Sequence, residues 1–178
     1  MLALGTVLYA WGLRDVATVV LLHFHGLLRT GEGLSARTSQ FSFSPNLAHG
    51  HMSLPFTKGI ARKGAVEGVS ITCAALCWPL VSHIARLPAG SLLLQRTPAQ
   101  YRVAFNAAIQ ELRLAGHFRP YSLRRGGATH DFQVHGQPDR TTDRGRWGNT
   151  RTARIYINTT DRKSTRLNSS HSSVSRMP

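Results

Sequence analysis

The feature that most constrains the fold is a change in the spacing of apolar residues between residues 38 and 72. Phe41 and Phe43 alternate with polar neighbours, alternation returns around Leu54, and 66–72 is rich in β-prone residues. A period of two is typical of half-buried strands, and the glycines between these runs are turn signals. The sequence therefore predicts a small antiparallel sheet of three short strands.

Helical patterns flank this segment on both sides. Residues 1–28 are strongly apolar and predict two buried helices that meet near Arg14 and Asp15, with Asp15 as the N-cap of the second. Thr97 followed by Pro98 marks another helix start, and apolar residues follow it at steps of three and four. The fold class we expect is α+β, mainly helical, with one small antiparallel sheet.

The apolar N-terminal segment is too short to cross a membrane. Arg14 and Asp15 divide it into two uncharged runs of 13 residues, whereas a spanning helix needs about 20 residues. The segment also lacks the charged opening and the cleavage site of a secretory signal. We therefore expect no membrane partner.

The chain is strongly basic. Its 178 residues carry 22 lysines and arginines against 8 acidic residues, a net charge of +14, and 42% of them are hydrophobic. The hydrophobic content fits one folded domain rather than a disordered chain. The charge favours polyanionic partners, of which nucleic acid is the commonest inside cells, with an anionic membrane surface or a ribosome-like particle as alternatives.

We expect neither a disulfide nor a metal site. Cys73 and Cys77 lie four residues apart in an apolar stretch, which indicates two small buried side chains on one helical face in a reducing compartment. The close histidine pairs in the first third of the chain have no companion cysteine or acidic cluster. The sequence therefore predicts no metal and no cofactor.

The C-terminal segment 161–178 is set apart from the rest. It begins Asp-Arg-Lys-Ser-Thr-Arg-Leu-Asn-Ser-Ser-His and resembles the translation of a common sequencing adapter. A disordered tail rich in serine and arginine is the alternative interpretation. Without this segment the chain keeps 18 basic and 7 acidic residues, so its basic character remains.

A stretch rich in arginine organises the C-terminal half. Residues 119–156 contain eight arginines and three aspartates but no lysine or glutamate, and they end on Tyr156. Arginine suits tetrahedral oxyanions, because its planar fork donates two parallel hydrogen bonds and keeps its charge. Composition alone leaves two interpretations open: a basic helix pair lying along nucleic-acid phosphates, or a site that attacks a phosphodiester.

The order of residues in this stretch resembles the catalytic domain of the tyrosine recombinase (phage integrase) family. The resemblance is carried by Ser122-Leu-Arg-Arg-Gly-Gly-Ala-Thr-His130, by Trp147, and by Tyr156 nine residues later. Tyr121 stands where the family usually has histidine. The resemblance implies that residues 1–160 form a domain of the DNA breaking-rejoining type, beginning too late to include the helical domain that usually precedes it.

The resemblance also implies a catalytic set spread along the chain. Arg29 and Arg124 would neutralise the phosphate, and Glu32, three residues after Arg29, would hold the first guanidinium in place. An ordinary helix-surface ion pair is the alternative for Arg29 and Glu32. Tyr156 would attack the phosphorus.

Three further side chains complete the implied chemistry. Lys58 would protonate the leaving oxygen, with Lys63 as the second choice, and a solvated turn lysine remains the alternative for either. Trp147 would donate its indole N–H to the phosphate. Tyr121 would hydrogen-bond the phosphate in place of the usual histidine.

Double-stranded DNA is the partner that the resemblance implies, with self-association of the protein on the DNA. The protein would act inside the cell, in the nucleus or nucleoid where the DNA lies. Four more arginines are expected to contact that DNA: Arg125, Arg146, Arg151 and Arg154.

The implied function is site-specific DNA recombination or integration through a covalent 3′-phosphotyrosyl intermediate. Two alternatives stay open. One is a non-catalytic DNA-binding remnant of a mobile-element integrase, and the other is an enzyme similar to type IB topoisomerases.

Two local features of the arginine-rich stretch bear on its secondary structure and packing. Gly126 and Gly127 lower helix propensity and are tolerated where another backbone, DNA included, comes close. The segment 138–146 is polar where relatives are apolar, and it predicts either a loop or a polar helix.

Overall fold

A computed structural model describes residues 2–55 and 67–157. Lys58, Lys63 and the segment 161–178 lie outside these residues, so the expectations about them stay predictions. The helices and strands, in chain order, are α1 (Leu2–Ala10), α2 (Arg14–His25), α3 (Thr30–Leu34), η1 (Thr38–Gln40), β1 (Phe41–Phe43), β2 (Gly50–Leu54), β3 (Glu67–Ile71), α5 (Ala74–Ile84), α6 (Pro98–Glu111), α7 (Pro120–His135), α8 (Pro138–Arg144) and α9 (Thr150–Tyr156).

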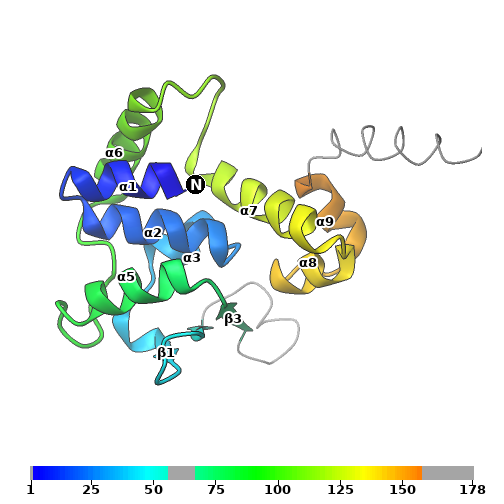
Figure 1. The fold of residues 1–178 in the computed structure, drawn as a ribbon, viewed down its shortest axis with the longest axis horizontal. Helices are drawn as coiled ribbons and strands as arrows, with labels where there is room; N and C mark the ends of the chain where they lie inside the picture. The colour runs from blue at the N-terminus through cyan, green and yellow to red at the C-terminus, as the bar shows by residue number, and fades with distance from the viewer. Residues whose placement is uncertain (1, 56–66, 158–178) are drawn as a thin grey trace, which may run out of the picture.

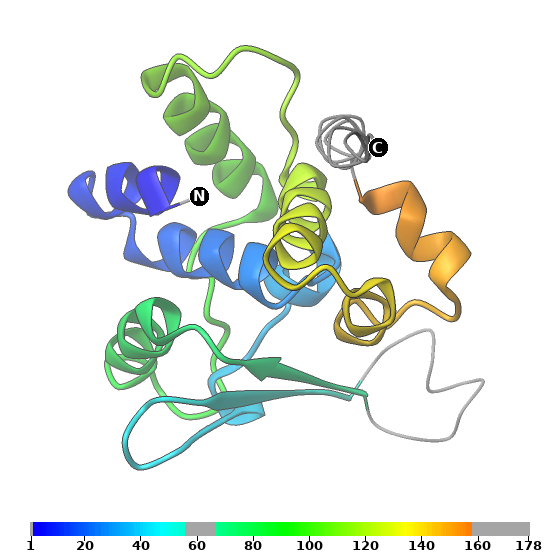
Figure 2. The same cartoon turned by 45° about the vertical axis from the view of Figure 1, so that its right-hand side comes forward.

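Helix α2 lies at the centre of the fold. It packs against α1, α5, α6 and α7, and every residue from Asp15 to His23 is buried. A helix that is apolar nearly all round needs neighbours on all sides, as the sequence predicted. Figures 1 and 2 show α1 and α6 on one side of α2, and α5 with the sheet on the other. Among the described helices, none is long and apolar enough to cross a bilayer.

The predicted sheet is confirmed. Its strands pair antiparallel in the order β1-β2-β3, with Phe41 opposite Met52 and Met52 opposite Val69. Met52 and Val69 are buried, which places one face of the sheet against the core. The mainly helical α+β fold class is therefore as expected.

Asp15 does not cap α2, contrary to the sequence-based prediction. The N-cap position is Leu13, and Asp15 lies in the first turn with 3% of its surface exposed. Its carboxylate accepts hydrogen bonds from the Gln95 backbone at 3.1 Å and from the Arg96 guanidinium. The carboxylate therefore fixes the chain just before α6 instead of ending a helix.

Helix α7 crosses α2 at very close range. A Cβ atom added at Gly127 would lie 2.1 Å from the carbonyl oxygen of Phe24, whereas one at Gly126 would meet the Phe24 ring at 3.4 Å. The backbone that Gly127 admits is thus that of α2. This contact brings the N-terminal half of α7 beside the α2–α3 turn.

The polar segment after α7 forms a helix, α8, held to α7 by a buried carboxylate. Asp131 of α7 is 6% exposed and accepts hydrogen bonds from Thr141 at 2.8 Å and from Arg144 at 3.0 Å. Arg144 also donates to the carbonyl oxygen of His25 at 2.7 Å. Buried polar partners therefore replace the apolar docking surface that this segment lacks.

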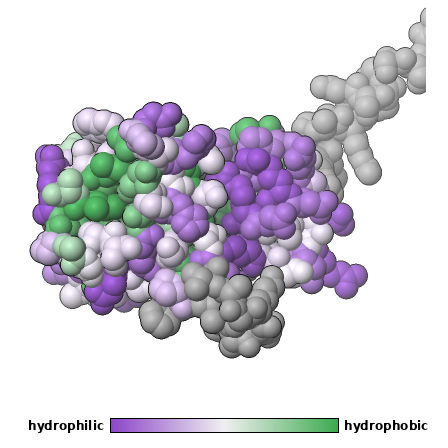
Figure 3. Space-filling model, turned by 90° about the horizontal axis from the view of Figure 1, so that it is seen from below, coloured by the Kyte–Doolittle hydropathy of each residue, from purple (hydrophilic) through white to green (hydrophobic). Residues whose placement is uncertain are grey.

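The face of the molecule seen from below carries a hydrophobic and a hydrophilic region. Seen from below, hydrophobic residues gather toward the side of α5, where Trp78 is exposed, and hydrophilic residues toward the side of α8 and α9 (Figure 3). The arginine-rich stretch thus makes a polar end of the molecule.

Candidate active site

Arg124 is the buried anchor of this polar end. It lies in the first half of α7, only 2% exposed, and its guanidinium donates to the carbonyl oxygen of Leu27 and, at 2.6 Å, to that of Gly145. These two acceptors come from the α2–α3 turn and from the turn after α8. The guanidinium therefore has a fixed orientation before any ligand is bound.

The two turns that hold Arg124 have unusual backbone conformations. Leu27 and Arg146, which follows Gly145, have φ values of +48° and +56°, in the left-handed region that non-glycine residues rarely adopt. Each such residue costs about 1–2 kcal/mol relative to a right-handed conformation. Strain of this kind is concentrated at functional sites, and here it aims two carbonyl groups at one guanidinium.

Two aromatic rings lie against Arg124. Its guanidinium carbon is 4.7 Å from the ring centre of Trp147 and 5.9 Å from that of Tyr156, and the two ring centres are 4.8 Å apart. Burial, together with the charges of Arg146 and Arg29, lowers the pKa of Arg124 to about 10. The side chain stays cationic at neutral pH.

Arg29 and Glu32 form the second charged element of the site. The Glu32 carboxylate accepts from the Arg29 guanidinium at 2.7 Å and from the Arg29 backbone N–H at 2.7 Å, so it ties the side chain to the start of α3. The Arg29 side chain keeps 40% of its surface exposed. It can therefore bind an anion while its orientation is held.

Tyr156 ends α9, and hydrogen bonds hold its hydroxyl group, its backbone and the start of its helix. Tyr121, at the start of α7, donates a hydrogen bond to the Tyr156 hydroxyl at 2.6 Å. Thr129 donates to the Tyr156 carbonyl oxygen at 3.2 Å, and Asn149 caps α9 by accepting from the Thr152 backbone at 2.8 Å. Asn149 is thus the N-cap of the helix that carries Tyr156.

The hydrogen bond between the two tyrosines changes the acidity of one of them. Burial, and then the hydrogen bond to Tyr156, raise the pKa of Tyr121 to about 12. The Tyr121 phenol therefore remains a hydrogen-bond donor throughout the neutral range. This donor is aimed at the Tyr156 hydroxyl oxygen.

These side chains share one cavity of about 470 Å³. Its walls come from the α2–α3 turn, α7, the α8–α9 turn and α9, and they include Arg29, Tyr121, Arg124, Arg146, Trp147 and Tyr156. Five of the six side chains expected to act in catalysis thus lie together, and Lys58, the sixth, lies outside the described residues. Glu32 contacts Arg29 as the resemblance implied.

The four arginines expected to contact DNA occupy two kinds of place. Arg125, Arg151 and Arg154 are exposed on α7 and α9. Arg146 is different, because its side chain is 7% exposed and pairs with Glu32 at 2.6 Å and with Glu67 at 3.4 Å. The contacts of all four with DNA stay predictions.

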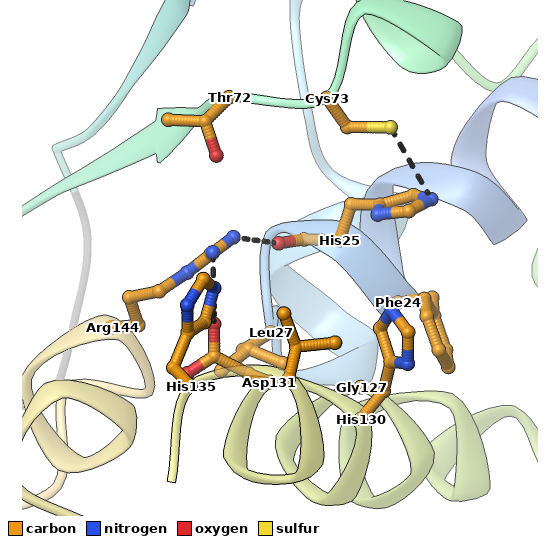
Figure 4. A pocket seen from close by; sticks show the side chains of 11 residues that line it. Phe24, His25, Leu27, Thr72, Cys73, Gly127, His130, Asp131, His135 and Arg144 are labelled. Carbon is orange, nitrogen blue, oxygen red and sulfur yellow. Dashed lines mark hydrogen bonds and ion pairs between the residues drawn. The ribbon is translucent and has the colours of Figure 1, made fainter. Parts of the chain in front are cut away.

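The sequence did not predict the cluster of polar side chains around Asp131, which joins α7, α8 and the end of α2 beside the site. Figure 4 shows Arg144 between the Asp131 carboxylate and the His25 carbonyl group. The cluster lines a second cavity of about 250 Å³. It holds the α8 end next to Gly145, whose carbonyl group orients Arg124. An aspartate in a helix paired with an arginine 13 residues later leaves no local sequence signal.

His25, on the wall of the second cavity, is held in its neutral form. Burial, followed by the charges of His130 and Arg144, lowers the pKa of His25 to about 4. Cys73 lies with its sulfur 3.9 Å from the His25 ring nitrogen, and Cys77 is buried, both as free thiols. Within residues 2–55 and 67–157, no three His, Cys, Asp or Glu side chains gather as a metal site requires.

Comparisons with known proteins identify the fold. No protein-family model and no curated protein matches the sequence. Among solved structures, the XerH site-specific recombinase bound to palindromic difH substrate, in a post-cleavage complex, superposes with a TM-score of 0.70 at 14% identity, covering 88% of this chain and 45% of that one. A pre-cleavage XerH complex with difH gives 0.65 at 15% identity, covering 85% and 45%. The Tn1549 transposon integrase in complex with transposon right end DNA gives 0.64 at 10% identity, covering 94% and 62%.

Proposed function

We propose that this chain, which has the fold of tyrosine recombinase catalytic domains and spans about half the length of the XerH recombinase, breaks and rejoins DNA through Tyr156. One observation carries the proposal. The Tyr156 ring shares a cavity with Arg29 and Arg124, two cations that come from positions 95 residues apart in the chain. A nucleophile beside two guanidinium groups is the arrangement that a phosphodiester requires.

The geometry supports a separate role for each of the two arginines at the phosphate. Arg124, fixed by two carbonyl groups, and Arg29, fixed by Glu32, would each donate to a non-bridging oxygen. Since these donors are oriented in advance, they stabilise the charge that develops in the transition state without first having to rearrange. Removal of one such donor typically costs about 100- to 1000-fold in rate.

The covalent step exchanges one phosphate ester for another. The Tyr156 oxygen forms a bond to phosphorus while the bond from phosphorus to the 5′ oxygen breaks, which leaves a 3′-phosphotyrosyl link and a 5′-hydroxyl group. The proton of the Tyr156 hydroxyl would pass to water in the open cavity, while Tyr121, which donates to the Tyr156 oxygen in the resting site, keeps its hydrogen bond to that oxygen. Lys58 is our candidate for the acid that protonates the 5′ oxygen.

DNA on either side of the cleaved phosphate would be held by exposed arginines. Arg125, Arg151 and Arg154 lie on α7 and α9, the helices that carry Arg124 and Tyr156. Contacts of this kind release counterions, so binding would weaken steeply as salt rises. Strand exchange needs more than one active site, and we propose that copies of the protein associate on the DNA.

Trapping of the covalent intermediate tests this function. The protein is incubated with a library of labelled duplexes that carry a nick, so that the cleaved fragment diffuses away and the adduct accumulates. We expect a protein–DNA adduct with the native chain and none with Tyr156→Phe. An adduct that survives this substitution, or no adduct with the native chain across the library, would defeat the proposal.

A second function, DNA binding without cleavage, is favoured by one specific observation. Tyr121 stands at the position where the family usually has histidine, and its pKa is raised to about 12, so it cannot accept a proton near neutral pH. This function predicts salt-sensitive binding and no adduct. The native protein distinguishes the two, because an enzyme forms the adduct with the nicked duplexes that it binds, whereas a passive binder retains the same duplexes and forms none.

A further inference from the structure

Arg146 brings a third guanidinium to the walls of the active-site cavity. It lies in the turn between α8 and α9, directly before Trp147, and its side chain is 7% exposed. One nitrogen, Nη2, donates to Glu32 at 2.6 Å, and Nε lies 3.4 Å from a carboxylate oxygen of Glu67. Arg146 therefore joins α3 and the start of β3 to the turn that leads to Tyr156.

Glu32 is shared between two arginines. Its Oε1 accepts from the Arg29 guanidinium at 2.7 Å, while its Oε2 accepts from Arg146 at 2.6 Å and from the Arg29 backbone at 2.7 Å. Three donors thus determine the plane of one carboxylate. The direction in which Arg29 points into the cavity depends on that plane, and so on Arg146.

The charges around the cavity support the same dependence. Arg29, Arg124 and Arg146 face the carboxylates of Glu32 and Glu67, which leaves an excess of positive charge for a phosphate. Without Arg146, Glu32 would pair with Arg29 alone and Glu67 would lose the ion pair seen here. Glu32 would then have two donors instead of three, both of them from Arg29, so its carboxylate would hold the Arg29 guanidinium in a less defined direction.

We propose that Arg146 is a positioning residue that acts through Glu32 to hold the Arg29 guanidinium ready for a phosphate. The proposal rests on the function proposed above and deepens it. In this role Arg146 acts on Arg29, in place of the direct DNA contact that the sequence predicted for it, and so differs from the exposed arginines of α7 and α9. The Nη1 atom of Arg146 is buried and has no hydrogen-bond partner among the described residues.

A double-mutant cycle between Arg29 and Arg146 tests the proposal. The protein carries Trp11→Phe and Trp78→Phe, both at exposed positions, so that Trp147 reports binding of inorganic phosphate beside Arg124. We expect Arg146→Met to raise the dissociation constant for phosphate about tenfold, in line with coupling measured for close charge pairs. In an Arg29→Met background, the same change should have less than about a twofold effect.

Two controls separate positioning from folding. Arg102→Met, at an exposed position on α6, removes the same charge away from the cavity and should leave the dissociation constant unchanged. Glu67→Gln combined with Arg146→Met relieves the lost ion pair. This combination should restore thermal stability without restoring phosphate affinity, whereas a purely structural role would restore both.

The outcomes distinguish this proposal from the function on which it rests. Equal effects of Arg146→Met with and without Arg29 overturn the positioning role, as does native protein whose Trp147 fluorescence ignores phosphate. The same variants are then tested for the trapped DNA adduct. If Arg29 and Arg146 are coupled in phosphate binding but the native protein forms no adduct, recombination is overturned and the positioning role is kept. If the adduct forms but the two residues are not coupled, recombination is kept and the positioning role is overturned.

Discussion

The two ends of this molecule are held together by different forces. Around α2, helices and sheet bury apolar side chains on all sides of one helix. Around α8 and α9, the elements are joined by a buried aspartate, arginines and backbone carbonyl groups. Apolar contacts are nondirectional, whereas hydrogen bonds fix angles. The α2 region therefore supplies stability, and the α8–α9 region supplies the orientation of the site.

The largest loss of stability is expected from a substitution in the apolar region around α2. Leu22 of α2 is fully buried, and Leu22→Ala should lower the free energy of unfolding by about 2–5 kcal/mol, because it removes apolar burial and leaves a cavity. Urea denaturation followed by circular dichroism measures the change. A loss below about 1 kcal/mol, the size seen for surface substitutions and smaller core changes, would contradict the central role of α2.

A smaller but localised loss is expected at the polar end. Asp131→Asn weakens the bonds to Thr141 and Arg144, and we expect a cost of about 1–3 kcal/mol. Hydrogen exchange should speed up in 138–157 and remain unchanged in α2. Asp143→Asn, at an exposed position on α8, is the matched control and should do neither. Faster exchange spread evenly over the chain would contradict the division into two regions.

The joint between the two regions can be tested with adjacent glycines. Gly127→Ala places a methyl group 2.1 Å from the Phe24 carbonyl oxygen, so α7 must move, at a cost of about 1–3 kcal/mol. Gly126→Ala meets only a ring edge at 3.4 Å and should gain up to about 1 kcal/mol of helix propensity. Thermal unfolding of both variants decides the matter, and equal shifts would show that α7 does not press on α2.

The smallest effect concerns pH at the same joint. The pKa of His25 is lowered to about 4 in the fold, so the folded state binds fewer protons than the unfolded chain below pH 6.5. Stability should therefore fall as pH drops from about 6.5 to about 4. His25→Gln should make this fall in the free energy of unfolding smaller by about 1 kcal/mol, a value reduced for partial solvent exposure. The pKa of His23 is also lowered by burial, so His23 still contributes to the pH dependence of stability in the His25→Gln variant.

Local patterns predicted the elements better than they predicted the contacts between them. The three strands, the two N-terminal helices and the cap at Thr97 each follow from neighbouring residues, and all are present. The wrong assignment of Asp15 has the opposite cause. Its partner Arg96 lies 81 residues away, and no local preference of aspartate indicates such a partner.

The site shows the same limit. Spacing and resemblance selected Arg29, Arg124, Trp147 and Tyr156, which the structure brings to one cavity. Sequence gave no sign that Arg146 would be buried between two glutamates, since Glu32 lies 114 residues away. Charged side chains are assigned to the surface by default, and only the fold shows which of them pair inside.

We claim that Tyr156 attacks a phosphate held by Arg29 and Arg124, and an activated phosphate ester tests this attack without the need for an acid. Short duplexes of random sequence carry a 3′-phosphate esterified to p-nitrophenol, a leaving group that needs no acid. We predict release of p-nitrophenol together with a nucleotide adduct on the peptide that contains Tyr156, reduced at least about 100-fold by Arg124→Met. Release that leaves Tyr156 unmodified, or that persists undiminished in Arg124→Met, would contradict the claim.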